Sequence, residues 1–438
     1  MSGPKVVRIV TREEILEICQ GMLARVDAAL AEWIRIGQRN DCVDNGAIEA
    51  ARGRRDALAA LIAVNRLMDL QKQAPLEEMF LREDLQSRLA KVAAEQAAAR
   101  SRDRREREIA ATMLRTLRER ATLIDPGLEQ RLARGEAAAI SEAFELLAVN
   151  SEESTASRDL AGRLRDGSGI ASFNQWLVDQ PITSVPAIEK IELRIAELAT
   201  TISDTVAANW RARLDEAASA DQARRNLLLD GLDVETGRAL TDARKQDAAM
   251  MDLELVLAEL GEAGIATDQY RANIEALNAA GLIERRTAAQ ESLNQHRTRT
   301  AALARREVVL KELSALGYEV IEGMATSWTE EGRLVLKSAT RPDYGVEVSA
   351  AGSSERMQMR ALVFDDGDGG PDPGRDRDAE TMWCGDVSSL QDRLAEIGGG
   401  LVIEKALPVG ATPLKRVALS SDRHRPATSS PLQTRTLD

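Results

Sequence analysis

The chain has 438 residues, with 58 Lys or Arg against 71 Asp or Glu, so its formal net charge is −13. Hydrophobic residues make up 44% and charged residues 29% of the chain, a balance that is typical of soluble globular proteins and excludes wholesale disorder. Aromatic residues are scarce at 3%, which favours long helices that pack through Leu, Ile, Val and Ala side chains.

The cysteine and histidine counts exclude several kinds of chemistry. The three cysteines, Cys19, Cys42 and Cys384, have neither zinc-site spacing nor the pairing that a disulfide framework needs, so we expect a reducing, cytoplasmic compartment. Because His424 lies in a polar tail, only His296 remains for Ser–His–Asp or Cys–His catalysis. No Walker A or dinucleotide-binding motif occurs, and we expect no cofactor.

Charge and hydropathy also limit the partners. No apolar stretch reaches the length of a membrane span, roughly 18 residues, and the N-terminus carries no apolar signal region. We therefore expect no membrane partner. The acidic net charge disfavours nucleic acid. The run from Arg100 to Glu108, with five Arg and three acids, is where a local basic patch would contact phosphates.

The first part of the chain predicts a strand followed by helices. Residues 1–10 form an extended segment, in which Val6–Val10 is rich in β-branched residues and is a candidate strand for the C-terminal sheet. Residues 11–149 form a helical hairpin or coiled-coil region. This region begins at a Thr11–Glu14 capping box, in which each side chain bonds the other residue's backbone amide. A polar turn at 37–46 then separates two antiparallel helices.

The second of these helices is predicted to run from Ala47 to Met68, after which Pro75 breaks the chain. The stretch 76–123 contains neither Gly nor Pro and predicts one long helix. Its middle, 100–108, is too polar to be buried on any face, so we expect it to lie in solvent.

Residues 150–183 are predicted to be a connector with a small aromatic patch, and residues 184–316 a second coiled-coil region. The clearest seam of that region is Ile188–Ile202, where apolar residues recur in steps of 3, 4, 3 and 4 and continue to Leu214 as one helix. Gly231 is expected to cap this helix or the next. The sequence does not decide whether such seams pair within one chain or between chains.

The pattern changes at Gly317, which is expected to end a long helix predicted from residue 283. Residues 317–418 predict a compact α+β domain with an antiparallel sheet, and residues 419–438 a disordered tail. The chain is therefore expected to be mostly α, with elongated helical hairpins or coiled coil followed by this small domain. Its predicted elements are strands at Tyr318–Glu322, Arg333–Ala339, Gly345–Ala350 and Arg356–Phe364, an acidic loop, a helix at Val387–Ile397 and a strand at Leu401–Ala406.

The acidic segment 365–386 is the best candidate for a specific contact. It contains eight acids and two Arg, a net charge of −6 in 22 residues. Its spacing fails the EF-hand pattern. We expect it to form a loop that is anchored by Trp383. The residues predicted to dock a partner protein are Asp365, Asp366, Asp368, Arg375, Asp376, Arg377, Asp378, Glu380 and Trp383.

An alternative interpretation places Mg²⁺ at carboxylates of the same domain. Pro342, Asp343 and Glu347 resemble the PD-(D/E)xK pattern of restriction-type nucleases, although Ser349 stands where that pattern has Lys. This alternative is a Mg²⁺-dependent enzyme that cleaves phosphoesters, with the ion held by oxygen ligands. The carboxylates that would hold it are Glu347, Asp365, Asp366 and Asp368.

Three functional hypotheses follow from these patterns. The leading one is a non-catalytic coiled-coil scaffold or regulatory subunit of a cytosolic, bacterial-type multiprotein assembly, because paired helices bury apolar seams without forming a convergent polar pocket. Its partners would be other protein subunits or further copies of the chain. The alternatives are the Mg²⁺-dependent enzyme and a nucleic-acid-associated coiled coil that binds through Arg100–Arg107.

Overall fold

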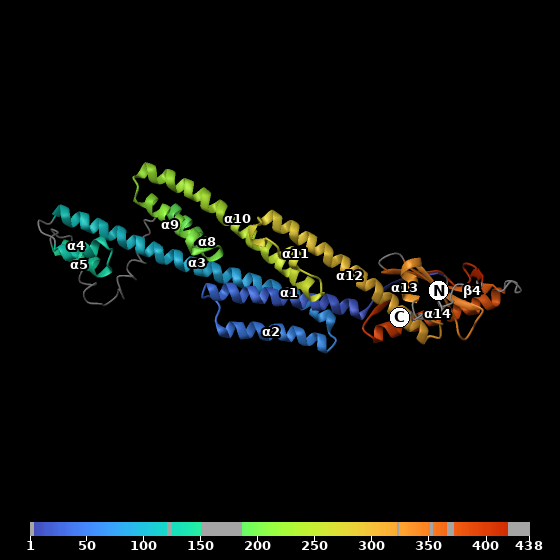
Figure 1. Cartoon of the computed structure of the whole chain (residues 1–438). Helices are drawn as coiled ribbons and strands as arrows, with labels where there is room; N and C mark the ends of the chain where they lie inside the picture. Colours follow the sequence, from blue (N-terminus) through green and yellow to red (C-terminus); the bar gives the residue numbers. More distant parts are fainter. Residues whose placement is uncertain are drawn as a thin grey trace, which may run out of the picture.

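The computed structural model describes residues 4–120, 125–149, 186–321, 324–350, 354–365 and 372–418. Long helices form an elongated stalk, and one end of the stalk carries a small domain built on a β-sheet (Figure 1). The prediction of a mostly α chain with a small C-terminal α+β domain and an antiparallel sheet is confirmed. The predicted connector at 150–183 and tail at 419–438 lie outside the described residues.

The molecule has three parts: a stalk of helices α1 to α3 and α8 to α12, a tip where α4 and α5 pack on the end of α3, and a head that contains the sheet, α13 and α14. None of the described helices has an apolar stretch long enough to cross a membrane. The first helices are α1 (Arg12–Arg39), α2 (Asn45–Ala63), α3 (Leu67–Arg120), α4 (Pro126–Ala133) and α5 (Ala137–Val149). The later ones are α8 (Pro186–Thr201), α9 (Asp204–Ser219), α10 (Gln222–Glu262), α11 (Asp268–Arg271), α12 (Ala279–Ala315), α13 (Met324–Glu331) and α14 (Pro373–Glu396). The strands are β1 (Lys5–Val10), β2 (Arg333–Lys337), β3 (Tyr344–Ala350), β4 (Arg356–Asp365), β5 (Gly400–Ala406) and β6 (Lys415–Ala418).

Only one of the two hydrogen bonds of the predicted capping box is present at the start of α1. The Thr11 hydroxyl accepts a hydrogen bond from the backbone N–H of Glu14 at 3.2 Å. The Glu14 carboxylate does not reach back to Thr11, because it accepts from Nε of Arg305 on α12 at 3.1 Å. This second contact ties the first helix of the stalk to the last one.

The helix predicted from Ala47 to Met68 is in fact two helices. α2 ends at Ala63, and the chain turns at Asn65, whose φ of 57° lies in the left-handed region that Asn adopts more readily than most residues. Nε of Arg12 donates to the Asn65 side-chain oxygen at 3.2 Å, which holds this turn against the start of α1.

The predicted break at Pro75 is wrong, because α3 continues through it without interruption. A proline inside a helix removes one backbone hydrogen bond and costs about 3 kcal/mol. Here Leu70, Ala74 and Leu81 of the same helix are at most 1% exposed and pack in one core with α1. Tertiary packing of this face offsets the local cost of the proline.

The seam predicted as one helix from Ile188 to Leu214 is interrupted. α8 ends at Thr201, and the Ser203 hydroxyl caps α9 by accepting from the N–H of Val206 at 3.4 Å. The predicted cap at Gly231 is also wrong, since this residue lies inside α10.

The apolar seam of α8 pairs within the chain. Ile188, Ile191 and Ile195 are at most 6% exposed and belong to one core with Leu214 of α9 and Leu232 of α10. From Ile188 to Leu198 this seam is therefore buried within the chain, whereas Ile202 at its end is exposed.

The polar middle of α3, predicted to be solvated, packs against α8. Arg105 lies 2.8 Å from the carboxylate of Glu189, and Arg104 pairs with Glu192. Glu192 is only 7% exposed. The prediction of a solvated helix holds for Arg102, Asp103, Arg107 and Glu108, which are exposed. It fails for Arg104 and Arg105, because their acidic partners lie more than eighty residues away in sequence.

The head sheet has the strand order β2-β3-β4-β1-β5, in which neighbouring strands are antiparallel, while β6 pairs in parallel with the end of β4. The prediction that Val6–Val10 joins the sheet is confirmed. The strand predicted at Tyr318–Glu322 is wrong, since its described part makes only an isolated bridge from Tyr318 to Ser338. Helix α13 and strand β6 were not predicted.

The acidic segment is largely helical rather than a loop. α14 begins at Pro373, and the Asp372 carboxylate caps it by accepting two backbone N–H bonds at 3.0 and 3.2 Å. Asp at the N-cap followed by Pro at the first helical position is a strong start signal. The helix predicted at Val387–Ile397 is the second half of this longer one.

One face of the sheet is covered by α12, α13 and α14. Val7 and Ile9 of β1 are fully buried there, in the same core as Trp328 of α13 and Trp383 of α14. α1 begins at Arg12, directly after β1. The first strand of the chain is therefore part of the head core and leads straight into the stalk.

Replacing Ile9 with Ala should lower the free energy of unfolding by about 2–5 kcal/mol, because a fully buried side chain is lost and a cavity remains. Val6→Ala is the matched control, since Val6 is partly exposed on the opposite face of the same strand and should cost less than about 1 kcal/mol. Urea denaturation followed by tryptophan fluorescence measures both changes. Equal losses in the two variants would contradict this placement of β1.

Candidate functional site

The described residues of the segment predicted to dock a partner differ in their exposure and contacts. Asp366 and Asp368 lie outside the described residues. Asp365, at the end of β4, lies 3.8 Å from Arg416 on the neighbouring strand β6. The other predicted residues lie on the first half of α14, and those exposed to solvent are Arg375, Arg377 and Asp378.

Three of the predicted docking residues hold α14 against the head. Asp376 accepts a hydrogen bond from the Tyr344 hydroxyl at 3.1 Å, and Glu380 accepts one from the backbone N–H of Gly410 at 2.6 Å. Burial, together with the Asp376 carboxylate, raises the pKa of Tyr344 to about 12. Trp383 is 2% exposed and lies in the core. Their role in this structure is to fix the helix in place.

Glu347, the central carboxylate of the metal alternative, is bound by cations of the chain itself. Its side chain accepts from Arg360 at 2.9 Å and from Lys415 at 2.6 Å. Burial raises the pKa of Glu347, but the hydrogen bonds from Arg360 and Lys415 outweigh it and bring the pKa below its ordinary value. Among the residues that the structure describes, no three His, Cys, Asp or Glu side chains gather as metal ligands.

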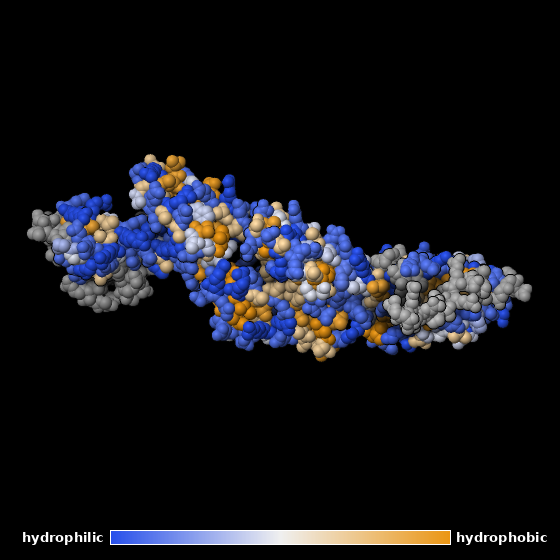
Figure 2. All heavy atoms as spheres, viewed as in Figure 1, coloured by the Kyte–Doolittle hydropathy of each residue, from blue (hydrophilic) through white to orange (hydrophobic). Residues whose placement is uncertain are grey.

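A groove of about 480 Å³ opens in the middle of the stalk, where α1, α3, α8 and α10 meet. Trp33 and Ile36 of α1, Leu81 and Leu85 of α3 and Met251 of α10 give it an apolar lining. Its volume lies within the range of about 300–1,000 Å³ that ligand sites occupy. Elsewhere the visible face of the stalk is mostly hydrophilic, with separate hydrophobic patches (Figure 2).

The position of Trp33 is fixed by its polar neighbours. The indole N–H donates to the Asp84 carboxylate at 2.9 Å, and the same carboxylate accepts from Nε of Arg88 at 2.6 Å. The Arg88 guanidinium in turn lies 5.7 Å from the centre of the Trp33 ring, within the range of a cation–π contact. The indole is therefore held in one orientation before anything enters the groove.

The polar part of the groove carries a carboxylate without a direct partner. Asp247 of α10 makes no hydrogen bond or ion pair with any described residue, whereas Glu32 of α1 pairs with Arg35 at 2.6 Å. Asp247 is exposed to solvent at the groove, and partial desolvation there, followed by repulsion from Glu32, raises its pKa, although the charges of Arg35 and Arg39 act in the opposite direction. Arg39, which also lines the groove, donates to the carbonyl of Thr200 at 2.6 Å and makes no ion pair with Asp247. The groove therefore suits a group that combines an apolar body with one positive charge.

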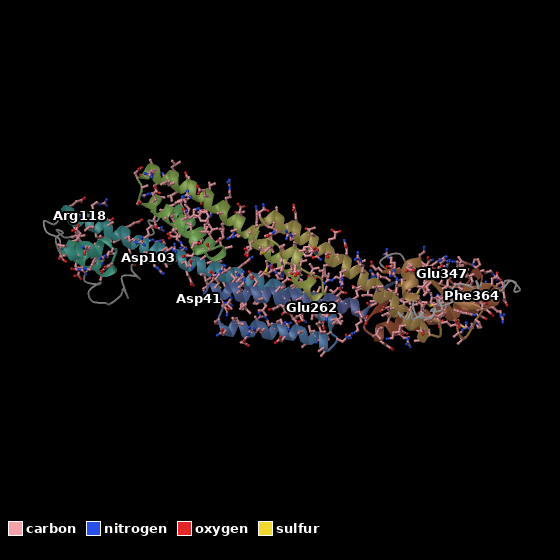
Figure 3. The ribbon with its side chains drawn as sticks, viewed as in Figure 1. Asp41, Asp103, Arg118, Glu262, Glu347 and Phe364 are labelled. Atoms are coloured by element: carbon pink, nitrogen blue, oxygen red, sulfur yellow. The ribbon has the colours of Figure 1, made fainter. Side chains whose placement is uncertain are left out.

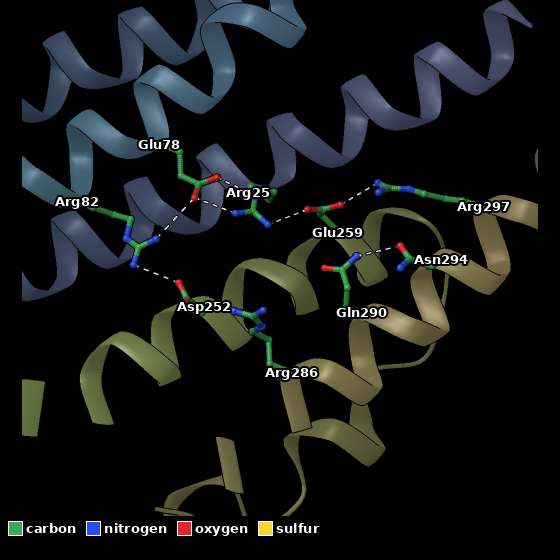
Figure 4. A network of polar contacts seen from close by, with 9 residues as sticks. All are labelled: Arg25, Glu78, Arg82, Asp252, Glu259, Arg286, Gln290, Asn294 and Arg297. Carbon is green, nitrogen blue, oxygen red and sulfur yellow. Dashed lines mark hydrogen bonds and ion pairs between the residues drawn. The ribbon is translucent and has the colours of Figure 1, made fainter. Parts of the chain in front are cut away.

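A network of ion pairs holds the helices together at the end of the groove nearest the head (Figure 4). Arg25 of α1 donates to Glu78 of α3 at 2.7 Å and to Glu259 of α10 at 3.0 Å. Arg297 of α12 donates to the same Glu259 at 2.8 Å. A Cβ atom at Gly21 would lie 2.5 Å from the Arg297 guanidinium, so glycine leaves the room that this bond needs. Three helices thus meet at the buried Glu259 carboxylate, and Arg25 links α3 to them through Glu78.

Searches of protein families, curated proteins and solved structures find no match to this chain, so its own geometry alone bears on its function.

Asp247→Asn should change the pH dependence of stability. Because the pKa of Asp247 is raised in the folded chain, the folded state binds more protons than the unfolded state, and stability falls as pH rises through the folded pKa. We expect the stability of the variant relative to the original chain to increase between about pH 3 and pH 7. Thermal denaturation across this range measures it.

Asp242→Asn is the control, because Asp242 is exposed on the same helix and outside the groove. It should show no such pH-dependent gain. A difference in stability between the original chain and Asp247→Asn that stays the same at all pH values would contradict the raised pKa of Asp247.

Proposed function

We propose that this chain is a non-catalytic scaffold or regulatory subunit of a cytosolic, bacterial-type multiprotein assembly, and that it holds protein partners at fixed positions along a stiff stalk. The observation that carries the proposal is the double connection between head and stalk. β1 lies inside the head sheet and leads into α1, while Leu310 and Leu313 of α12 belong to the head core. Two helices of the stalk therefore fix the orientation of the head.

The continuity of α3 supports the same proposal. Its 54 residues span about 80 Å at the rise of an ideal helix. One end lies beside α1 near the head, and the other carries the tip, where Leu117 packs with Leu128 of α4 and Ile140 of α5. A single helix thus sets the separation between the two ends of the molecule.

The groove supports a protein partner of defined chemistry. An amphipathic helix that presents apolar side chains would cover Leu85 and Met251, the partly exposed apolar residues of the groove, as in other helix-in-groove complexes. A Lys or Arg on that helix would pair with Asp247. We propose that such a helix, from another subunit of the assembly, binds in the groove.

A photo-crosslinking residue at Gln86, which is exposed within the groove, tests this proposal in cells of the native host. We expect one partner protein to crosslink there. Asp247→Lys should reduce the crosslink by at least about tenfold, a loss of about 1.4 kcal/mol, because a basic partner would then meet a like charge.

Asp242→Lys on the same helix is the matched control and should leave the crosslink unchanged, since it adds the same charge outside the groove. The proposal fails when Gln86 captures no partner. It fails equally when both charge-changing variants reduce the crosslink to the same extent, because general repulsion would then account for the loss.

A further inference from the structure

A second hollow lies where α3 leaves the stalk toward the tip. It measures about 270 Å³ and is lined by residues of α3, α8 and α9. Arg100, Asp103, Arg104 and Arg107 lie at positions i, i+3, i+4 and i+7 of α3, which places them on one face of the helix. Figure 3 labels Asp103 on this stretch of α3. Three guanidinium groups of one helix thus line the same hollow.

Helix α9 adds a fourth arginine to the hollow. Arg211 pairs with Asp204 at 2.7 Å, but its Nε is buried and has no hydrogen-bond partner. A buried N–H without an acceptor costs about 1–3 kcal/mol. The side chain of Arg211 is 17% exposed. An acceptor in the hollow that reached this Nε would remove the cost.

Arg100 and Arg107 also line the hollow and lack partners of their own in the part of the chain that the structure describes. Neither makes an ion pair or a side-chain hydrogen bond with any described residue. Burial and then the nearby charge of Arg211 lower the pKa of Arg100, so two guanidinium groups repel each other in a partly dehydrated place. An anion between them would convert repulsion into attraction.

Three carboxylates also line the hollow and limit what can bind. Glu192 is occupied by Arg104. Asp103 and Asp215 have no direct partner among the described residues and would repel an anion that came near them. The lining therefore carries four positive and three negative charges, which favours a small, localised anion over an extended polyanion.

We propose that this hollow binds a small phosphate-type oxyanion, bridging Arg100 and Arg107 of α3 to Arg211 of α9. Guanidinium groups bind phosphate oxygens through paired, charge-assisted hydrogen bonds, which suits three arginines that converge from two helices. The volume is just below the range of drug-sized sites, which begins at about 300 Å³. The bound anion ties α3 to α9 at the base of the tip, a role separate from partner binding in the groove.

Isothermal titration calorimetry of the full chain tests this inference at constant ionic strength. Inorganic phosphate, pyrophosphate and ADP are titrated separately, so that a free anion is distinguished from the terminal phosphate of a nucleotide. We expect at least one to bind with a Kd below about 1 mM. Arg100→Ala and Arg211→Ala should each raise that Kd by at least about tenfold.

Two arginines outside the hollow provide matched controls. Arg102 is exposed on α3, and Arg213 on α9 pairs with Glu235 at the surface. Their Ala variants should leave Kd within about twofold, because neither lines the hollow. Asp215→Asn should tighten binding several-fold by removing a repelling charge, a gain that damage to the fold would not produce.

Three results would overturn the proposal. The first is that none of phosphate, pyrophosphate and ADP binds with a Kd below about 1 mM. The second is an equal loss of affinity in Arg100→Ala and Arg102→Ala, which would indicate a diffuse effect of net charge. The third is tighter binding of a single-stranded oligonucleotide that depends on Arg102 as much as on Arg100, which would favour a nucleic-acid surface instead.

Discussion

The pairing of β1 with β4 and β5 is the contact on which the arrangement of this molecule depends. β1 is the first strand of the chain, yet its neighbours in the sheet lie at 356–365 and 400–406. Val7 and Ile9 bring apolar area into a head core that already receives the end of α12. Because α1 and α12 are both held in the head core, the head sets the direction of the stalk. The helices that pack on α1 run along the same direction.

In this stalk, ion pairs fix the alignment of neighbouring helices, a role that large aromatic side chains share in other helical proteins. With aromatic residues at 3%, the cores contain mainly Leu, Ile and Ala, which pack closely but specify register weakly. Glu259 aligns α10 with α1 and α12 by accepting hydrogen bonds from Arg25 and Arg297. Glu192 aligns α8 with α3 by pairing with Arg104. Breaking such a partly buried pair leaves one charge uncompensated, so these contacts select one alignment of the helices even where they add little net stability.

Local patterns in the sequence predicted local structure well and long-range contacts poorly. The Thr11 cap, the end of the long helix at Gly317 and the alternating strands β1 and β2 depend on neighbouring residues, and each is present. The strand predicted at Tyr318–Glu322 is the exception. The break at Pro75 was wrong because packing of a distant helix outweighs a local preference. For the candidate site, the burial of Trp383 was predicted but not the helix around it. The groove was missed because four helices, far apart in sequence, each contribute only part of its lining.

The two hollows of the stalk arise from the same constraint, and we propose that they bind groups of opposite charge. Antiparallel helices bury their apolar seams along most of their length, so space opens only where a helix ends or diverges from its neighbours. At the end of α8 this leaves Asp247 beside an apolar floor, and at the base of the tip it leaves Arg100 beside Arg211. Because water or a partner must satisfy such charges, we propose that binding specificity in this molecule resides at the helix junctions and not along the seams.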